Sequence, residues 1–179
     1  MRNKTIWMPV WAIAAAALIL LGASAALNPL RVANARAELN SALRSVLPGA
    51  VEFTQQTYAG EDDNISKIYR AENGYVVETC TDGYAGSITM LVGVSNEGVV
   101  TGAQVRDMHE TIGLGARAKN DAAFLGQLRN SRGNLTVGEN VDAISGATVT
   151  SKAIVRSVNS ASAFATGADV ASGATTWGG

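Results

Sequence analysis

The sequence predicts an α+β protein in which one N-terminal transmembrane helix precedes a domain with a mainly antiparallel sheet flanked by helices. Three patterns support this: an uncharged apolar run at the start, successive short apolar runs separated by glycine turns, and apolar residues at helical spacing on both sides of those runs. The expected organisation is a transmembrane anchor at 1–28, a connecting amphipathic helix at 29–50, an extracytoplasmic domain at 51–166 and a flexible tail at 167–179.

Composition excludes several classes of protein. The 179 residues carry a net charge of -1, which gives no basic surface for nucleic acid. The single cysteine, Cys80, excludes an internal disulfide framework and a multi-cysteine metal site, and we expect it to be a half-buried structural thiol. With His109 as the only histidine, no metal site is expected.

Residues 6–27 form an uncharged stretch of 22 residues, long enough to cross a bilayer as one helix. Arg2 and Lys4 precede it, so the positive-inside rule places the N-terminus in the cytoplasm. We expect an uncleaved anchor. The alternative is a signal peptide, because the small residues at 23–25 fit a signal-peptidase cleavage site. With either alternative, the chain from residue 28 onward lies on the periplasmic or extracellular side of the cytoplasmic (inner) membrane.

The next segments predict one helix followed by two hairpins. Apolar residues recur at helical spacing over 32–46, and Pro48-Gly49 ends that helix. Asn73-Gly74 joins a strand at 65–71 to a strand at 75–79, and Asn96-Glu97-Gly98 joins strands at 88–94 and 99–105. Successive hairpins indicate a mainly antiparallel sheet.

The last third predicts a short helix, a short strand and a long helix. Asn120 or Asp121 is suited to cap a helix that presents Phe124 and Leu128 on one face. Residues 135–137 fit a short strand. A helix at about 150–164 follows, with its buried stripe on Ile154, Val158, Ala161 and Ala165.

Between that strand and that helix lies the stretch with the clearest functional signal, Asp142-Ala143-Ile144-Ser145-Gly146-Ala147-Thr148. Gly146 and Ala147 allow close approach of the backbone to a ligand, and Thr148, Thr150 and Ser151 are all candidate N-caps. The free N–H groups and positive dipole end of a helix start bind phosphate. The same residues also fit an ordinary loop that caps a helix.

A second candidate segment runs from Met108 to Gly115. It follows a strand directly and contains two glycines and the only histidine, as loops that line a site often do. A surface turn with an incidental histidine is the alternative.

Together these residues resemble the FMN-binding domain of the G subunit of the Rnf/Rsx electron-transport complex and, more distantly, the C subunit of the sodium-pumping NADH:quinone reductase. The resemblance covers nearly the whole chain. It is carried by the N-terminal anchor, Gly83-Tyr84-Ala85-Gly86, His109-Glu110-Thr111-x-Gly113-Leu114-Gly115 and Asp142-x-x-Ser145-Gly146-Ala147-Thr148.

The resemblance implies a covalent flavoprotein. In that family a flavin transferase uses FAD and magnesium to attach FMN to the final threonine of the last motif through a phosphoester, which here is Thr148. The transferase would recognise Asp142, Ser145, Gly146, Ala147 and Thr148. The expected FMN contacts are Ser145, Gly146, Ala147, Val149, Thr150, Lys152, His109, Glu110, Thr111, Gly113 and Leu114. Lys152 is as readily a solvated lysine, and Tyr84 is a weaker candidate for a place near the ring.

The implied function is electron transfer in a membrane-bound, ion-translocating ferredoxin:NAD+ oxidoreductase, with Rnf subunits A, B, C, D and E as partners. The chain lacks an NAD fingerprint and iron–sulfur cysteines, so it is expected to be a redox subunit that is not catalytic alone. The alternatives are a stand-alone membrane-anchored flavoprotein relay or reductase, and a non-redox module that binds a phosphate ligand.

Two features of the chain differ from the family pattern. The family often has proline where this chain has Ile112, so we expect a less rigid loop with the same contacts. The tail repeats the motif spacing in Asp169-Val170-Ala171-Ser172-Gly173-Ala174-Thr175. No apolar helix follows that copy, and we expect Thr175 to be a chance match.

Overall fold

The computed structural model describes residues 31–111 and 115–167. The chain divides into two units, residues 1–40 and 41–179. The described part of the first unit, 31–40, is helical. No helix within the described ranges has the length and hydropathy needed to cross a membrane. The apolar run at 6–27 lies outside these ranges, so the transmembrane helix stays a prediction.

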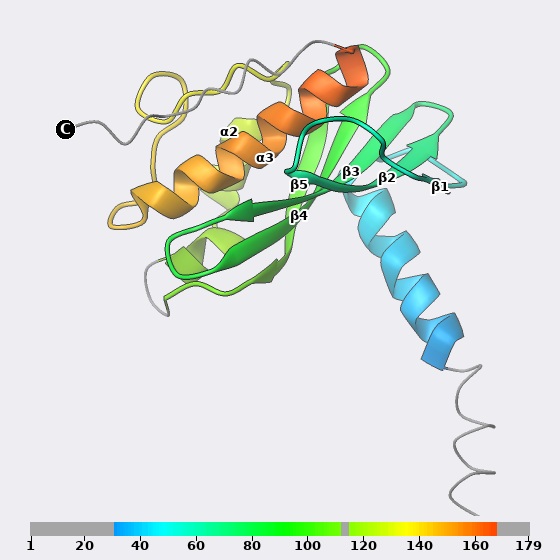
Figure 1. Cartoon of the computed structure of the whole chain (residues 1–179), viewed down its shortest axis with the longest axis horizontal. Coiled ribbons are helices and arrows are strands. Elements are labelled where there is room, and N and C mark those ends of the chain that lie inside the picture. Colours follow the sequence, from blue (N-terminus) through cyan, green and yellow to red (C-terminus); the bar gives the residue numbers. More distant parts are fainter. Residues whose placement is uncertain (1–30, 112–114, 168–179) are drawn as a thin grey trace, which may run out of the picture. The chain divides into compact units, whose positions relative to one another are not determined.

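The second unit is built on one five-stranded antiparallel sheet in which every strand pairs with its neighbour in the sequence (Figure 1). The strands are β1 (Thr54–Gln56), β2 (Ile65–Ala71), β3 (Gly74–Asp82), β4 (Ser87–Ser95) and β5 (Val100–Met108). The predicted antiparallel sheet flanked by helices is therefore confirmed, and β1 is an addition. Its sequence, Thr-Gln-Gln, is exposed and has no apolar alternation that would have indicated a strand.

Both predicted hairpins form at the predicted turns. Gly74 has a φ of 157°, and a Cβ there would overlap the carbonyl of Val94 on the neighbouring strand. Gly98 has a φ of 78°, and its N–H donates to the carbonyl of Ser95 at 3.0 Å. Only glycine adopts such backbone angles without strain, so these residues set the register of the sheet.

Helix α3 (Thr148–Thr166) lies across one face of the sheet (Figure 1). Its apolar residues meet the inward side chains of the central strands, and Val77, Val92 and Val94 are fully buried there. The predicted stripe is present: Ile154, Val158 and Ala161 are buried, and Ala165 is partly buried. The helix begins two residues before the predicted start and ends two residues after the predicted end.

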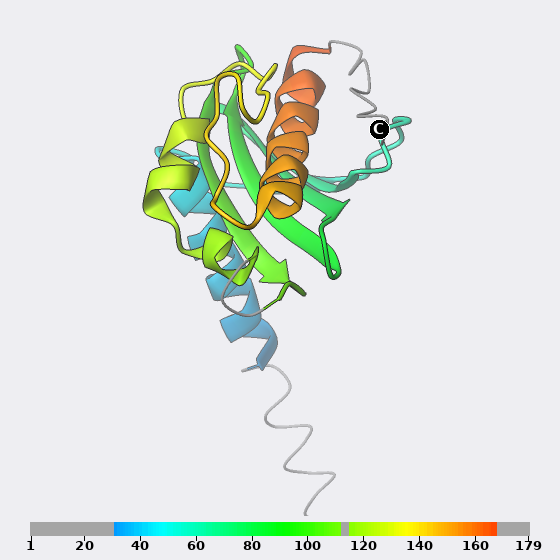
Figure 2. The same cartoon turned by 90° about the vertical axis from the view of Figure 1, so that its left-hand side faces the viewer.

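The short helices cover the β5 edge of the sheet. The 3-10 helix η1 (Gly115–Lys119) and α2 (Ala122–Leu128) both contact β5, and Figure 2 shows α2 beside that strand while α3 lies over the sheet. Asp121 is the N-cap of α2, with its carboxylate accepting from the Phe124 N–H at 2.9 Å. The predicted cap and the buried pair Phe124 and Leu128 are thus confirmed.

The opposite face of the sheet receives residues 41–47, the helical end of the segment predicted at 32–46. Gly93 and Gly102 face each other on β4 and β5, and a Cβ on Gly93 would overlap the Val46 carbonyl. The same carbonyl accepts a hydrogen bond from Thr101 Oγ1 at 2.5 Å. Two facing glycines therefore let the helix backbone sit directly on the strands, and Val46 is 2% exposed.

Two local predictions were wrong. Residues 135–137 form no strand: Thr136 accepts backbone hydrogen bonds from residues 139–141, so the chain turns, and only an isolated Val137–Val141 bridge remains. Cys80 is exposed instead of half-buried. Side chains alternate along β3, so Thr79 and Thr81 face α3 and Cys80 faces away from it.

The contact between Val46 and Gly93 predicts that Gly93→Ala destabilises the fold. The added methyl group would push the helix backbone off the sheet, and overpacking of this kind lowers stability by about 1–3 kcal/mol. The control is Gly126→Ala in α2, where a Cβ meets nothing within 4 Å. That change should raise stability by up to about 1 kcal/mol. Thermal unfolding followed by circular dichroism checks both, and equal effects would contradict the interpretation.

Candidate functional site

The Asp142–Thr148 stretch forms a tight turn that ends at the first residue of α3. The Ala147 N–H donates to the Ile144 carbonyl at 2.9 Å, which closes the turn over Ser145 and Gly146. Gly146 has a φ of 76°, in the left-handed region that glycine adopts without strain and other residues avoid. The glycine of the motif is therefore needed for the backbone shape.

Ser151 holds this turn against the helix. Its hydroxyl donates to the Ala147 carbonyl and accepts from the Ile144 N–H, both at 3.0 Å, and the residue is fully buried. The three hydroxyl residues predicted as possible caps do not cap the helix: the N-cap is Ala147, which has no capping side chain. Ser151 instead supports the turn from inside the first helical turns.

The N-terminus of α3 is thus left open to an external acceptor. The first N–H groups of a helix have no intrahelical partner, and here no side chain at the N-cap satisfies them. Thr148 is the first helical residue and its side chain is exposed. Lys152, one turn later, is exposed as well, whereas Thr150 is 1% exposed. Thr148 is therefore reachable by a modifying enzyme, and the donors beside it are free.

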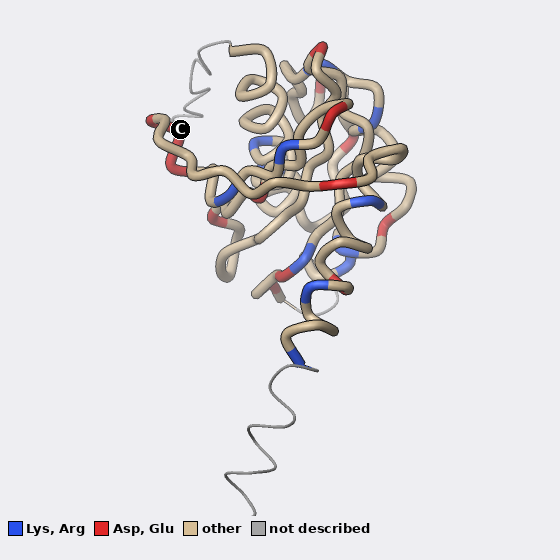
Figure 3. The backbone as a smooth tube through the Cα atoms, turned by 90° about the vertical axis from the view of Figure 1, so that its right-hand side faces the viewer, with Lys and Arg blue, Asp and Glu red and all other residues tan. Residues whose placement is uncertain are grey.

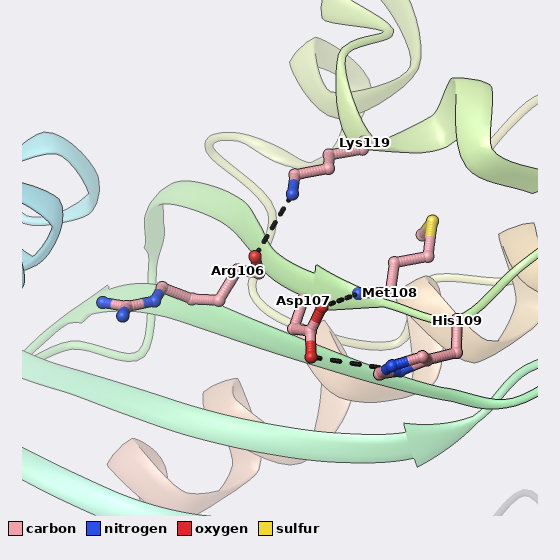
Figure 4. Close-up of polar contacts among 5 residues, drawn as sticks. All are labelled: Arg106, Asp107, Met108, His109 and Lys119. Carbon is pink, nitrogen blue, oxygen red and sulfur yellow. Dashed lines mark hydrogen bonds and ion pairs between the residues drawn. The ribbon is translucent and has the colours of Figure 1, made fainter.

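The candidate segment at 109–111 begins where β5 ends. His109 is exposed, and its Nδ1 lies 3.9 Å from Asp107 Oδ2 (Figure 4). The His109 N–H donates to the Ser87 carbonyl at 3.2 Å, and the Thr111 carbonyl accepts from the Ala116 N–H at 3.3 Å. The backbone of this segment is held by its neighbours, while the imidazole and the Thr111 side chain face solvent.

Glu110 differs from both neighbours because its carboxylate turns inward. Oε1 accepts a hydrogen bond from the Tyr84 N–H at 2.6 Å. A Cβ on Gly86 would lie 2.8 Å from the His109 carbonyl oxygen, so the 83–86 turn and the 109–111 segment are in direct contact. The structure brings together two motifs that lie 26 residues apart in the sequence. Tyr84 itself is 74% exposed.

The Ser145 turn also borders a cleft of about 470 Å³. It is bordered by η1, by α2 and by residues 142–145. Arg117 and Ser145 both line it. Arg117 was not predicted from the sequence, because it lines the cleft only through the packing of η1 beside the turn.

Several of the residues singled out from the sequence lie outside the described ranges, among them Ile112, Gly113, Leu114 and Thr175. Among the residues that the structure describes, basic and acidic residues are interspersed along the backbone of the domain (Figure 3), and no cluster of potential metal ligands is present in these ranges.

Comparison with known proteins connects this geometry to a cofactor. Residues 83–163 match the FMN-binding domain family. The matched range begins at the Gly83 turn and includes the 109–111 segment, the Ser145 turn and most of α3. The fold and the site thus define an FMN-binding domain.

The relatives are G subunits of ion-translocating complexes. The G subunit of the proton-translocating ferredoxin:NAD(+) oxidoreductase complex from Clostridium ljungdahlii is 34% identical over 60% of this chain and 68% of its own length. Its Na(+)-translocating counterpart from Acetobacterium woodii is 42% identical over 48% and 46% of the two chains. The G subunit of the ion-translocating oxidoreductase complex from Methanosarcina acetivorans is 35% identical over 87% and 89%.

This chain therefore belongs to the G-subunit family of ion-translocating oxidoreductase complexes. The family predicted from the sequence motifs is confirmed.

The two hydrogen bonds of Ser151 predict that Ser151→Ala loosens the Ser145 turn. The Ile144 N–H would lose its acceptor, and an unsatisfied buried donor lowers stability by about 1–3 kcal/mol. Amide hydrogen exchange at Ile144 should become faster than in the native protein. The control is Lys152→Ala, the exposed next residue, which should leave that amide unchanged. Unaltered exchange at Ile144 in Ser151→Ala would show that the turn is held by other contacts.

Proposed function

We propose that this chain is the electron-transfer subunit of an Rnf-type, membrane-bound ferredoxin:NAD+ oxidoreductase and that it carries FMN esterified to Thr148. The observation that carries the proposal is the exposure of Thr148 at the uncapped start of α3. Thr148 is exposed at the first position of α3, directly after a glycine turn and an N-cap without a capping side chain. A phosphoryl group there would meet free N–H donors and the positive end of the helix dipole.

The linkage requires chemistry from outside the chain. A threonine hydroxyl is a weak nucleophile, and the described residues hold no cluster of metal ligands that would activate it. A flavin transferase with FAD and Mg²⁺ would supply that activation. The Thr148 oxygen would form the new bond to phosphorus, the hydroxyl proton would pass to a base of the transferase, and AMP would leave.

Several residues of this chain are suited to hold the attached group. Gly146 and Val149 would present backbone near the phosphate and Ser145 would offer a hydroxyl, whereas the Ala147 N–H already donates to the Ile144 carbonyl. Lys152 on α3 and Arg117 in the adjoining cleft are exposed cations on the elements beside the turn. Their positive charge would balance the phosphodiester.

The ring of the flavin would then lie against the loops beside the helix start. His109 and Thr111 present exposed side chains, and Tyr84 projects from the neighbouring turn. FMN supplies the capacity to accept and release electrons, and the protein contributes attachment, orientation and electrostatic surroundings. Gly113 and Leu114 stay candidates from the sequence alone.

Partners must supply the other redox centres. The chain contains one cysteine, too few to hold an iron–sulfur cluster. We propose Rnf subunits A, B, C, D and E as those partners, because the relatives are named as subunits of such complexes. We further propose that residues 6–27 anchor the chain in the cytoplasmic membrane, with the FMN domain on the outer side.

Two other functions make different predictions. A stand-alone flavoprotein relay would carry the same covalent FMN, but it would purify without five further subunits. A module that binds a free phosphate ligand would be colourless after purification from cells that contain the transferase. Affinity purification from native membranes, with subunit identification and an absorption spectrum, separates all three.

Attachment at Thr148 predicts that Thr148→Ala abolishes covalent flavin. With the transferase co-expressed, the native chain should give a flavin-fluorescent band on a denaturing gel, and Thr148→Ala should give none. Thr148 is exposed, so the substitution should leave the thermal unfolding temperature nearly unchanged. Thr136→Ala, which alters another exposed threonine in the same domain, should retain the band. A fluorescent Thr148→Ala band would exclude this residue as the attachment site.

The motif copy in the tail provides a separate test of what the transferase recognises. If the folded helix start is required, FMN should be found by peptide mass spectrometry only on the peptide that contains Thr148. FMN on the Thr175 peptide would show instead that the local sequence is sufficient.

A further inference from the structure

The carboxylate of Glu110 lies where three segments of the site meet. These are the 83–86 turn, the 109–111 segment and the start of η1 beside the first turns of α3. Glu110 Oε1 accepts from the Tyr84 N–H at 2.6 Å, a short charge-assisted hydrogen bond. Tyr84 is therefore held by its backbone, while its side chain is 74% exposed.

Two glycines make room for this carboxylate. A Cβ on Gly83 would overlap Glu110 Oε1. A Cβ on Gly115 would lie 2.7 Å from Glu110 Oε2 and 2.7 Å from Thr150 Oγ1, so these two oxygens share one side of Gly115. Thr150 is 1% exposed and belongs to the same first turn of α3 as Thr148. The carboxylate thus connects the Tyr84 turn to the helix that bears the proposed attachment site.

The burial of Glu110 Oε2 does not stabilise the folded protein. This oxygen is buried and has no hydrogen-bond partner among the described residues. Burying a carboxylate oxygen without a partner is unfavourable. The side chains of His109 and Thr111, on either side of Glu110, are exposed to solvent. We therefore expect the inward carboxylate to position the segments that it contacts.

We propose that Glu110 is a positioning residue that holds the 83–86 turn against the start of α3, and so fixes the Tyr84 side chain as part of the surface that covers FMN on Thr148. The proposal rests on the proposed function. It gives Glu110 a different role from His109 and Thr111, because Glu110 acts through the turn that it binds.

The test uses the full-length chain, purified in detergent after co-expression with the transferase. Three variants are compared with the native protein: Glu110→Ala removes the acceptor, Glu110→Gln keeps an oxygen for the Tyr84 N–H, and Gly83→Ala displaces the carboxylate from the opposite side. Glu139→Ala, at an exposed glutamate, is the control. The readouts are amide hydrogen exchange at Tyr84 and flavin fluorescence of the folded protein, which responds to aromatic groups at the ring.

In Glu110→Ala and Gly83→Ala, exchange at Tyr84 should become about tenfold faster, the factor expected for one lost hydrogen bond. Flavin fluorescence should change in both and return toward the native value in Glu110→Gln. Slow exchange in β3 and β4 would show that each variant is folded. If Glu110→Ala does not fold, Gly83→Ala and Glu110→Gln decide the result.

Unchanged exchange at Tyr84 in the folded disrupting variants would overturn the proposal. So would faster exchange with unaltered fluorescence, or a Glu110→Gln protein that behaves like Glu110→Ala. If the native chain carries no flavin, the proposed function fails and the role of Glu110 in positioning flavin fails with it. The Tyr84 exchange data would still show whether Glu110 holds the turn.

Discussion

One buried polar contact fixes where α3 lies on the sheet, and the position of the site depends on it. The Thr81 hydroxyl on β3 is hydrogen-bonded to the Ala153 carbonyl at 3.2 Å and to Ser157 Oγ at 3.0 Å. Thr81 is 2% exposed and Ser157 fully buried. Sliding the helix by one turn would leave buried hydroxyls without partners, which is unfavourable. Thr148, the first residue of α3, is therefore held at a defined place relative to the sheet.

The two faces of the sheet pack against their helices in different ways. On the α3 face, small side chains such as Ser157 and Ala161 allow a long helix to approach closely. On the other face, Gly93 and Gly102 remove the side chains altogether, so that the backbone at Val46 rests on the strands. The site occupies neither face. It is formed by the loops at the start of α3 and the end of β5, which leaves it open to an external partner.

Much of the fold was predictable because its signals are local. Asn73-Gly74 and Asn96-Glu97-Gly98 mark turns through backbone angles that few residues adopt, and the continuous apolar run of β4 indicates a buried strand. β1 was missed because its polar residues are exposed. Residues 135–137 were wrongly predicted as a strand. The Thr136 carbonyl accepts hydrogen bonds from the N–H groups of residues 139–141, and this turn is not evident from the apolar residues at 135 and 137.

The sequence by itself determined the family, through three short motifs, and the candidate residue Thr148. It did so because each motif is contiguous. Only the tertiary structure shows which residues of different motifs and elements contact one another. Glu110 meets the Tyr84 N–H, Arg117 reaches the cleft beside Ser145, and Ser151 supports the turn instead of capping the helix. These contacts join residues on different elements, and their distances follow from strand register and helix placement, which no local pattern encodes.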